Sequence, residues 1–226
     1  MVSTMILLAL FVISMLIMSF NFNKKKKIFF FGDSITELGM EPGGYISMIN
    51  EMIEKEGYAE KLETVGSGIS GNGVYELSLR LEADILSRFP YMVVVYIGIN
   101  DIWNKIVTNS GTDYEIFGTY YESIINKLMA ANCKVLLCTP AVIGEYADGE
   151  NEQDADLNLY GNWIMSFAEK NSLPYVDLRK KFLQYDQQVN VENKESGILT
   201  LDKVHLTDKG NELVAREIWG AIKRIK

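Results

Sequence analysis

The chain has 226 residues, a length typical of one domain with a sizeable core, and carries a formal net charge of −8. Four of its cationic side chains are Lys24–Lys27, and without them the rest of the chain carries −12. So acidic a domain has no electrostatic basis for binding nucleic acid, and we exclude that class of partner.

Residues 1–23 have no charged side chain and are rich in Leu, Ile, Met and Phe. A stretch of this length is long enough to span a bilayer as a helix. No Lys or Arg precedes it and no A-x-A-like cleavage site follows it, as a secretory signal peptide would require. We therefore predict an uncleaved N-terminal membrane anchor, a hydrophobic helix over 1–23, followed by a basic flank at 24–27.

Strands and helices alternate along residues 28–226, which predicts one α/β domain with a central parallel sheet covered on both faces. Ligands of such doubly wound sheets bind beyond the carboxyl ends of the strands. The segments 98–113 and 140–153 are expected to be loops that shape this edge. The predicted strands are 27–32, 61–65, 91–97, 134–139 and 175–177, and the predicted helices are 43–56, 74–88, 114–131, 154–171 and 208–225.

The chain offers little for metal binding. Cys133 and Cys138 lie five residues apart on a predicted strand, with Cα atoms roughly 16 Å apart, too far for a disulfide. Both are expected in the core, and with a single histidine they form no zinc site. The acidic stretch 148–156 is predicted to be a solvated loop running into a helix, with a metal site as the less favoured alternative.

Polar or glycine residues stand where predicted strands end. Ser34 follows the first strand, Gly71 the second and Asn100 the third, while Asp202 and His205 precede the last helix. His205 is the only imidazole, so it is the one candidate base for Ser34 near neutral pH, and Asp202 is placed to orient its ring. The Gly71 N–H and the Asn100 amide are candidate donors to an oxyanion. Taken singly, Gly71, Asn100 and Asp202 are explained at least as well by turns or caps, and a lone histidine is more often structural than catalytic.

Together, four ordered blocks resemble the SGNH (GDSL-type) hydrolase family over 28–226: Gly32-Asp33-Ser34, Gly71 within 68–72, Asn100 within 98–101, and Asp202-Lys203-Val204-His205. The resemblance implies a flavodoxin-like three-layer α/β/α fold and a triad of Ser34, His205 and Asp202. It also implies an oxyanion hole made by the Ser34 N–H, the Gly71 N–H and the Asn100 side chain. Ile99 departs from the commoner second glycine of the third block.

We therefore predict a serine ester hydrolase that cleaves small carboxylic esters through an acyl-enzyme, with no metal or organic cofactor. Carbohydrate acetyl esters, lysophospholipids and thioesters are alternative substrates. Trp103 is a candidate for lining the substrate pocket, and core packing explains it equally well. The side of the membrane is left open, because a basic flank favours the cytoplasm whereas an exported hydrolase needs the opposite orientation.

Two alternatives of other classes remain. Gly66, Gly68 and Gly71 satisfy the G-x-G-x-x-G fingerprint of dinucleotide-binding proteins, although they follow the second predicted strand rather than the first. The second alternative is a membrane-tethered ester- or carbohydrate-binding domain whose catalytic site is inactive.

Overall fold

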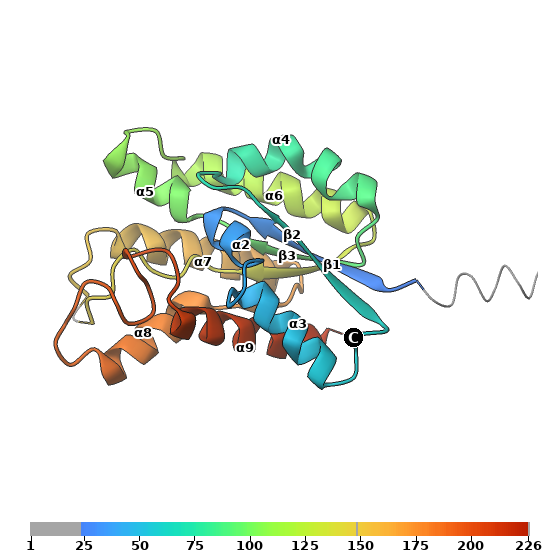
Figure 1. The fold of residues 1–226 in the computed structure, drawn as a ribbon. Helices are drawn as coiled ribbons and strands as arrows, with labels where there is room; N and C mark the ends of the chain where they lie inside the picture. Colours follow the sequence, from blue (N-terminus) through green and yellow to red (C-terminus); the bar gives the residue numbers. More distant parts are fainter. Residues whose placement is uncertain (1–23, 148, 226) are drawn as a thin grey trace, which may run out of the picture.

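The computed structural model describes residues 24–147 and 149–225. Its centre is a five-stranded parallel sheet of order β2-β1-β3-β4-β5, the flavodoxin-like order. Helices lie on both faces of this sheet, so the predicted three-layer α/β/α architecture is confirmed (Figure 1). The strands are β1 (Lys26–Gly32), β2 (Leu62–Gly68), β3 (Met92–Tyr96), β4 (Lys134–Cys138) and β5 (Tyr175–Val176).

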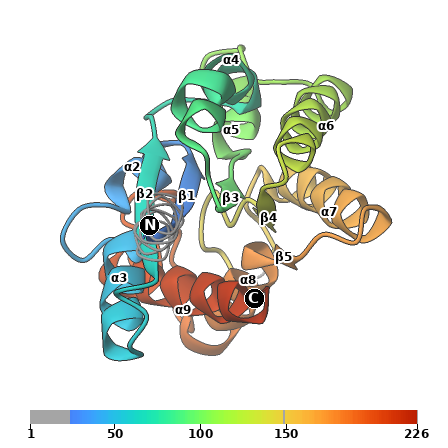
Figure 2. The same ribbon diagram turned by 90° about the vertical axis from the view of Figure 1, so that its right-hand side faces the viewer.

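The helices divide between the two faces. Figure 2 shows α4, α6 and α7 on one side of the sheet and α3 and α9 on the other. Helices α2, α5 and α8 lie toward the end of the molecule where the strands finish (Figure 1). The bounds are α2 (Ser34–Leu38), α3 (Tyr45–Lys55), α4 (Val74–Asp84), α5 (Ile99–Val107), α6 (Tyr114–Ala130), α7 (Asp154–Lys170), α8 (Leu178–Val189) and α9 (Asp208–Arg224), with a short 3₁₀ turn at Leu86–Arg88.

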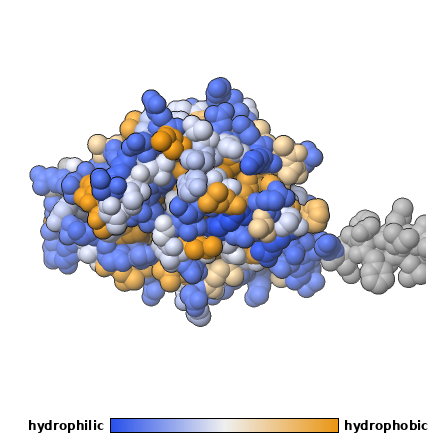
Figure 3. Space-filling view, turned by 90° about the horizontal axis from the view of Figure 1, so that it is seen from above, coloured by the Kyte–Doolittle hydropathy of each residue, from blue (hydrophilic) through white to orange (hydrophobic). Residues whose placement is uncertain are grey.

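The two central strands carry the core. Ile28, Phe29, Phe30 and Phe31 of β1 are fully buried, as is every residue of β3. A strand covered on both faces needs such an unbroken apolar run, because neither side of it meets water. Polar side chains dominate the outer surface over α4, α5 and α6, with apolar ones scattered among them (Figure 3).

Three expectations about local structure were wrong. The segment 98–113 was expected to be a loop, but its first part forms α5, so Asn100 and Trp103 are helical. Helix α8 was not predicted. Strand β2 runs to Gly68 rather than to Val65, because its pairing with β1 continues to Gly32.

The longer β2 bears on the dinucleotide alternative. Gly66 and Gly68 lie within β2, whereas the fingerprint needs its glycines in a turn between strand and helix. A Cβ at Gly68 would stand 2.1 Å from the Glu37 nitrogen and 2.6 Å from the Asp33 oxygen. Close packing of α2 across β2 therefore accounts for this glycine, and the dinucleotide-binding alternative is disfavoured.

The two cysteines lie in the core. Cys133 and Cys138 are both buried and free, as predicted. Lys26 and Lys27, at the end of the predicted basic flank, are the first two residues of β1. No helix within residues 24–147 and 149–225 is long and apolar enough to cross a bilayer. The predicted anchor over 1–23 lies outside the described residues.

Candidate active site

Ser34 sits at the junction between β1 and α2. The Asp33 side chain caps the helix by accepting the Ile35 N–H at 3.0 Å, and Ser34 is the first helical residue. An N–H at the start of a helix has no partner within that helix. The Ser34 N–H is therefore left without a partner inside α2. Because Ser34 follows the end of β1, this N–H and the Ser34 hydroxyl lie at the carboxyl edge of the sheet.

The three residues predicted to form a triad are hydrogen-bonded in series. The Ser34 Oγ lies 2.9 Å from the His205 Nε2, and the His205 Nδ1 lies 2.7 Å from the Asp202 Oδ2. This order matches that of a nucleophile, a base and an orienting acid. Ser34 and His205 stand 171 residues apart in the chain. The fold therefore assembles this arrangement.

The Asp202 carboxylate holds its own turn as well as the imidazole. Its Oδ1 accepts the backbone N–H groups of Val204 (3.2 Å) and His205 (2.8 Å). Partial burial opposes ionisation of Asp202, but these bonds and the one from the His205 ring outweigh it, and the pKa of the carboxyl falls below its usual value. An ionised Asp202 at neutral pH favours the tautomer of His205 that presents a bare Nε2 to Ser34.

Glu145 supports the loop that carries Asp202 and His205. Its buried carboxylate accepts the backbone N–H groups of Ile198 (2.9 Å), Leu199 (2.6 Å) and Thr200. An antiparallel bridge between Thr200 and Leu206 then closes the loop. Sequence reasoning missed Glu145, and no pattern in the sequence connects it to residues more than 50 positions away.

The predicted oxyanion donors lie on two neighbouring segments. Gly71 has φ +79°, a left-handed conformation that glycine adopts without strain. Asn100 lies in the first turn of α5, and its Nδ2 donates to the Asn72 carbonyl at 3.0 Å. An amide nitrogen carries two hydrogens, so one fixes the side chain and the other remains for a substrate oxygen.

Two further side chains hold the glycine-rich segment in place. Glu37 of α2 accepts both the N–H (2.8 Å) and the hydroxyl of Ser70. These bonds lower the pKa of Glu37. Arg80 of α4 donates to the Gly32 carbonyl (2.8 Å), the Ser67 carbonyl (3.1 Å) and the Asn72 Oδ1 (2.8 Å). Arg80 therefore ties the ends of β1 and β2 to the residue that positions Asn100, and the sequence analysis did not identify it.

Two buried carboxyls lie beneath these loops. Burial raises the pKa of Asp33 to about 7, and the nearby Asp101 adds to that rise. Burial also raises the pKa of Asp101 to about 6, against hydrogen bonds from Thr112 and the Val74 N–H. Both oxygens of Asp101 lie 3.1 Å from that N–H, which joins α5 to the start of α4.

Trp103 lies on α5, three residues after Asn100. It is half-buried and packs against the core. The pocket next to Gly71 and Asn100 is lined instead by residues such as Asn104 and Tyr75. The role of Trp103 in binding substrate therefore stays a prediction.

The described part of the acidic stretch forms ion pairs. Asp154 contacts Arg179 at 2.9 Å and Asp156 contacts Lys105 at 3.0 Å. Among the described residues, no group of three or more His, Cys, Asp or Glu side chains is placed to hold a metal ion.

Comparison with known proteins gives the family. The profile of the GDSL-like Lipase/Acylhydrolase family matches residues 30–213, which include all five candidate site residues. An acetylxylan esterase of Geobacillus stearothermophilus is 26% identical over 209 residues, covering 84% of this chain and 91% of that protein. An isoamyl acetate-hydrolyzing esterase 1 homolog of Bos taurus is 22% identical, covering 88% and 82%.

Solved structures agree. The crystal structure of an acetyl xylan esterase is 48% identical, with a TM-score of 0.85 over 87% of this chain and 99% of that one. A hydrolase from the metagenome of Lake Arreo, 24% identical with a TM-score of 0.76, shares the fold. The chain belongs to the GDSL-like lipase/acylhydrolase family and is a serine ester hydrolase.

Proposed function

We propose that this hydrolase removes acetyl groups from carbohydrates, with Ser34 as nucleophile, His205 as base and Asp202 as orienting acid. The observation that carries the assignment of residues is the continuous chain of hydrogen bonds from Ser34 Oγ through His205 to Asp202. In this proposal the Ser34 N–H, the Gly71 N–H and the Asn100 amide form the oxyanion hole.

The reaction follows from this arrangement. As the Ser34 Oγ attacks the ester carbonyl carbon, its proton moves to the His205 Nε2, and the carbonyl oxygen becomes an oxyanion. Collapse of this intermediate breaks the bond to the alcohol, which takes the proton from His205 and leaves an acyl-serine. Water then repeats both steps and releases the carboxylic acid and free Ser34. Asp202 stabilises the imidazolium that forms in each half.

Acetylated carbohydrate is favoured over the other candidate esters by the relatives. The acetyl xylan esterase that is 48% identical is named for such a substrate, and so is the relative from Geobacillus stearothermophilus. The alternative of an inactive binding domain is disfavoured, because a decayed site has no reason to keep the Ser34–His205–Asp202 series aligned.

The test is release of acetate from acetylated xylo-oligosaccharides by wild type and by Ser34→Ala. We expect the variant to lose several orders of magnitude in kcat. Ser87→Ala is the matched control, because this serine is exposed in the 3₁₀ turn that follows α4, and its hydroxyl donates to the Ala83 carbonyl. Equal rates for wild type and Ser34→Ala would contradict the assignment of the nucleophile. Hydrolysis of p-nitrophenyl acetate without release of acetate from sugars would contradict the proposal that the substrate is an acetylated carbohydrate.

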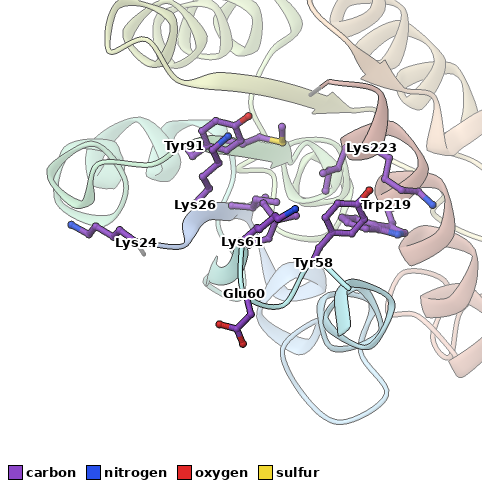
Figure 4. A pocket seen from close by; sticks show the side chains of 12 residues that line it. Lys24, Lys26, Tyr58, Glu60, Lys61, Tyr91, Trp219 and Lys223 are labelled. Carbon is purple, nitrogen blue, oxygen red and sulfur yellow. The ribbon is translucent and has the colours of Figure 1, made fainter. Parts of the chain in front are cut away.

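We also infer that residues 1–23 anchor the domain to a membrane by the sheet edge opposite to Ser34. A pocket of about 420 Å³ lies at that edge, with four lysines and three aromatic residues around it (Figure 4). Lys24, the first described residue, is one of these lysines, and only two residues separate segment 1–23 from β1. Lysines and aromatic rings beside a hydrophobic span are typical of a membrane interface.

This orientation would point the candidate active site away from the bilayer, because the seven residues of β1 span roughly 23 Å. The test is alkaline carbonate extraction of membranes that contain the full chain or a chain beginning at Lys24. We expect only the full chain to stay in the pellet. Recovery of the full chain in the supernatant, or loss of residues 1–23 by mass spectrometry, would contradict the anchor.

A further inference from the structure

A second cavity, of about 480 Å³, opens next to the candidate oxyanion hole, between α4, α5 and α6. Most of the residues that line it are polar. Gly71 and Asn100 form one side of it. A cavity of this volume is in the range of small-molecule sites and far exceeds what an acetyl group fills. Ser34 and His205 do not line it, so its occupant lies beside the reacting ester and does not include it.

The lining discriminates between classes of ligand. Glu76, Asp101 and Asp113 contribute carboxyls, and among the described residues that line the cavity there is no Lys, Arg or His. A nearby cation on α5, Lys105, pairs with Asp156 at 3.0 Å. A phosphate or carboxylate group would meet acids here with no partner for its charge, so an anionic headgroup is excluded.

Few of the residues that line the cavity are apolar. Ile116 and the two tyrosines Tyr75 and Tyr120 are its only large apolar or aromatic members, and the rest are polar residues or glycines. A long acyl chain would therefore leave about half of its surface against polar groups, which weakens the advantage of burying it. The cavity suits a compact neutral ligand with many hydroxyl groups.

The tyrosines give such a ligand a platform. Tyr75 of α4 and Tyr120 of α6 pack edge to face, with ring centroids 5.2 Å apart, and Tyr75 is 43% exposed. Aromatic rings of this kind pack against the C–H face of a sugar, while carboxylate and amide groups around the rim accept and donate hydrogen bonds with its hydroxyls. Asn104, Ser110 and Thr112 supply further polar groups.

We propose that this cavity is a subsite for a neutral sugar unit next to the acetylated one, and that Tyr75 sets the preference for oligosaccharides. The inference rests on the proposed function, because it places the flanking part of that substrate. Binding energy from a unit remote from the reacting ester is used to position the ester, so it raises kcat/KM for the longer substrate.

The test compares two acetyl esters, acetylated xylotriose and acetylated methyl xyloside, in wild type, Tyr75→Ala, Tyr75→Phe and Leu79→Ala. We expect Tyr75→Ala to lower kcat/KM for the triose about tenfold more than for the single-unit ester, the size of one aromatic contact. Tyr75→Phe keeps the ring and should restore most of the preference. Leu79, 66% exposed on the same helix and not part of the cavity, is the matched control, and its variant should leave the ratio unchanged.

Binding without turnover gives an independent readout. Calorimetric titration with unacetylated xylotriose should show binding to wild type and at least tenfold weaker binding to Tyr75→Ala. Equal losses on both esters, or wild-type affinity for xylotriose in Tyr75→Ala, would overturn the subsite while leaving the proposed function intact. A wild type that cleaves p-nitrophenyl acetate but neither sugar ester would instead refute the proposed function, and the subsite with it.

Discussion

Replacing Arg80 by lysine removes the link between the strand ends and the oxyanion segment while keeping the charge. The guanidinium bonds to Gly32, Ser67 and Asn72 and pairs with Asp84 at 2.8 Å, and its side chain is only 13% exposed. A lysine ammonium is a single point donor and does not span acceptors on three segments. We therefore expect Arg80→Lys to retain the contact with Asp84 and to lose at least two of the others.

The magnitude follows from those bonds. A hydrogen bond to a charged group contributes about 1.5–3 kcal/mol, so two lost bonds lower the free energy of unfolding by about 3–6 kcal/mol, and less if water replaces them. Asn72 also accepts the Asn100 amide, so the donor for the oxyanion shifts with it. Losing such a donor costs about 100- to 1000-fold in kcat, and displacing it should cost roughly 10- to 100-fold with little change in KM.

The assay is saturation kinetics on p-nitrophenyl acetate, with thermal unfolding of the same samples. Arg80 lies over the Phe31 ring, 4.6 Å from its centroid, and Arg88 lies over the Phe29 ring at 4.8 Å. Arg88→Lys is therefore the matched control, because Arg88 is exposed and remote from the site. A purely structural role for Arg80 would lower the melting temperature and leave kcat of the folded enzyme unchanged. That result, or wild-type values of both, would refute the positioning argument.

Three further predictions concern the orienting acid Asp202, the buried carboxyl of Asp186 and the closely packed Gly68. Asp202→Asn should lower kcat by about 100- to 10,000-fold, less than His205→Ala, because the ring loses its orienting charge; pre-steady-state kinetics measures this. Burial, and then the charge of Glu145, raises the pKa of Asp186 to about 7, so ionisation costs stability as pH rises from about 4 to 7. Asp186→Asn should therefore stabilise the fold at pH 8 by on the order of 1–3 kcal/mol more than at pH 5, by urea unfolding. Gly68→Ala should lower the free energy of unfolding by about 3 kcal/mol, because the new Cβ meets backbone 2.1 Å away.

Each of these three has an outcome that contradicts it. Equal kcat in Asp202→Asn and wild type would remove the acid from the mechanism. A stability gain in Asp186→Asn that does not vary with pH would show that its charge is not the cause. Gly220→Ala is the control for Gly68→Ala, since the nearest atom to its Cβ is 3.9 Å away. It should be neutral or stabilising, and an equal loss in both variants would contradict the packing argument.

Local patterns predicted most of the fold and the five candidate residues. The apolar runs of β1 and β3 are continuous over several residues, and the alternation of strands with helices predicts a parallel sheet. Only the family resemblance implied the order of its strands. The missed helix α5 also carries a local signal, because Ile99, Ile102 and Ile106 recur at helical spacing, with Trp103 beside them. Leu178, Phe182 and Tyr185 do the same for α8. Polar residues between these positions hide the periodicity in both segments.

The supporting contacts were beyond sequence reasoning for a different reason. Arg80 binds the carbonyls of Gly32 and Ser67, and Glu145 binds the N–H groups of residues 198–200. Backbone groups are the same at every position, so no residue type marks the acceptor or donor that such a side chain will meet. The separations, 48 residues for Arg80 to Gly32 and up to 55 for Glu145, lie far outside any motif.

Arg80 and Glu145 carry opposite charges because they support parts of the site that present opposite backbone groups. Carbonyl oxygens face Arg80, whereas N–H groups face Glu145. The Gly32 and Ser67 carbonyls lie near the carboxyl ends of β1 and β2, and a cation, Arg80, donates to both on the side that holds Ser34 and Asn100. The loop before α9 instead turns its N–H groups inward, and an anion, Glu145, satisfies them on the side that holds His205. The contact of 2.9 Å between Ser34 and His205 joins these two separately supported halves. Loosening either support therefore separates the hydroxyl from its base without altering either residue.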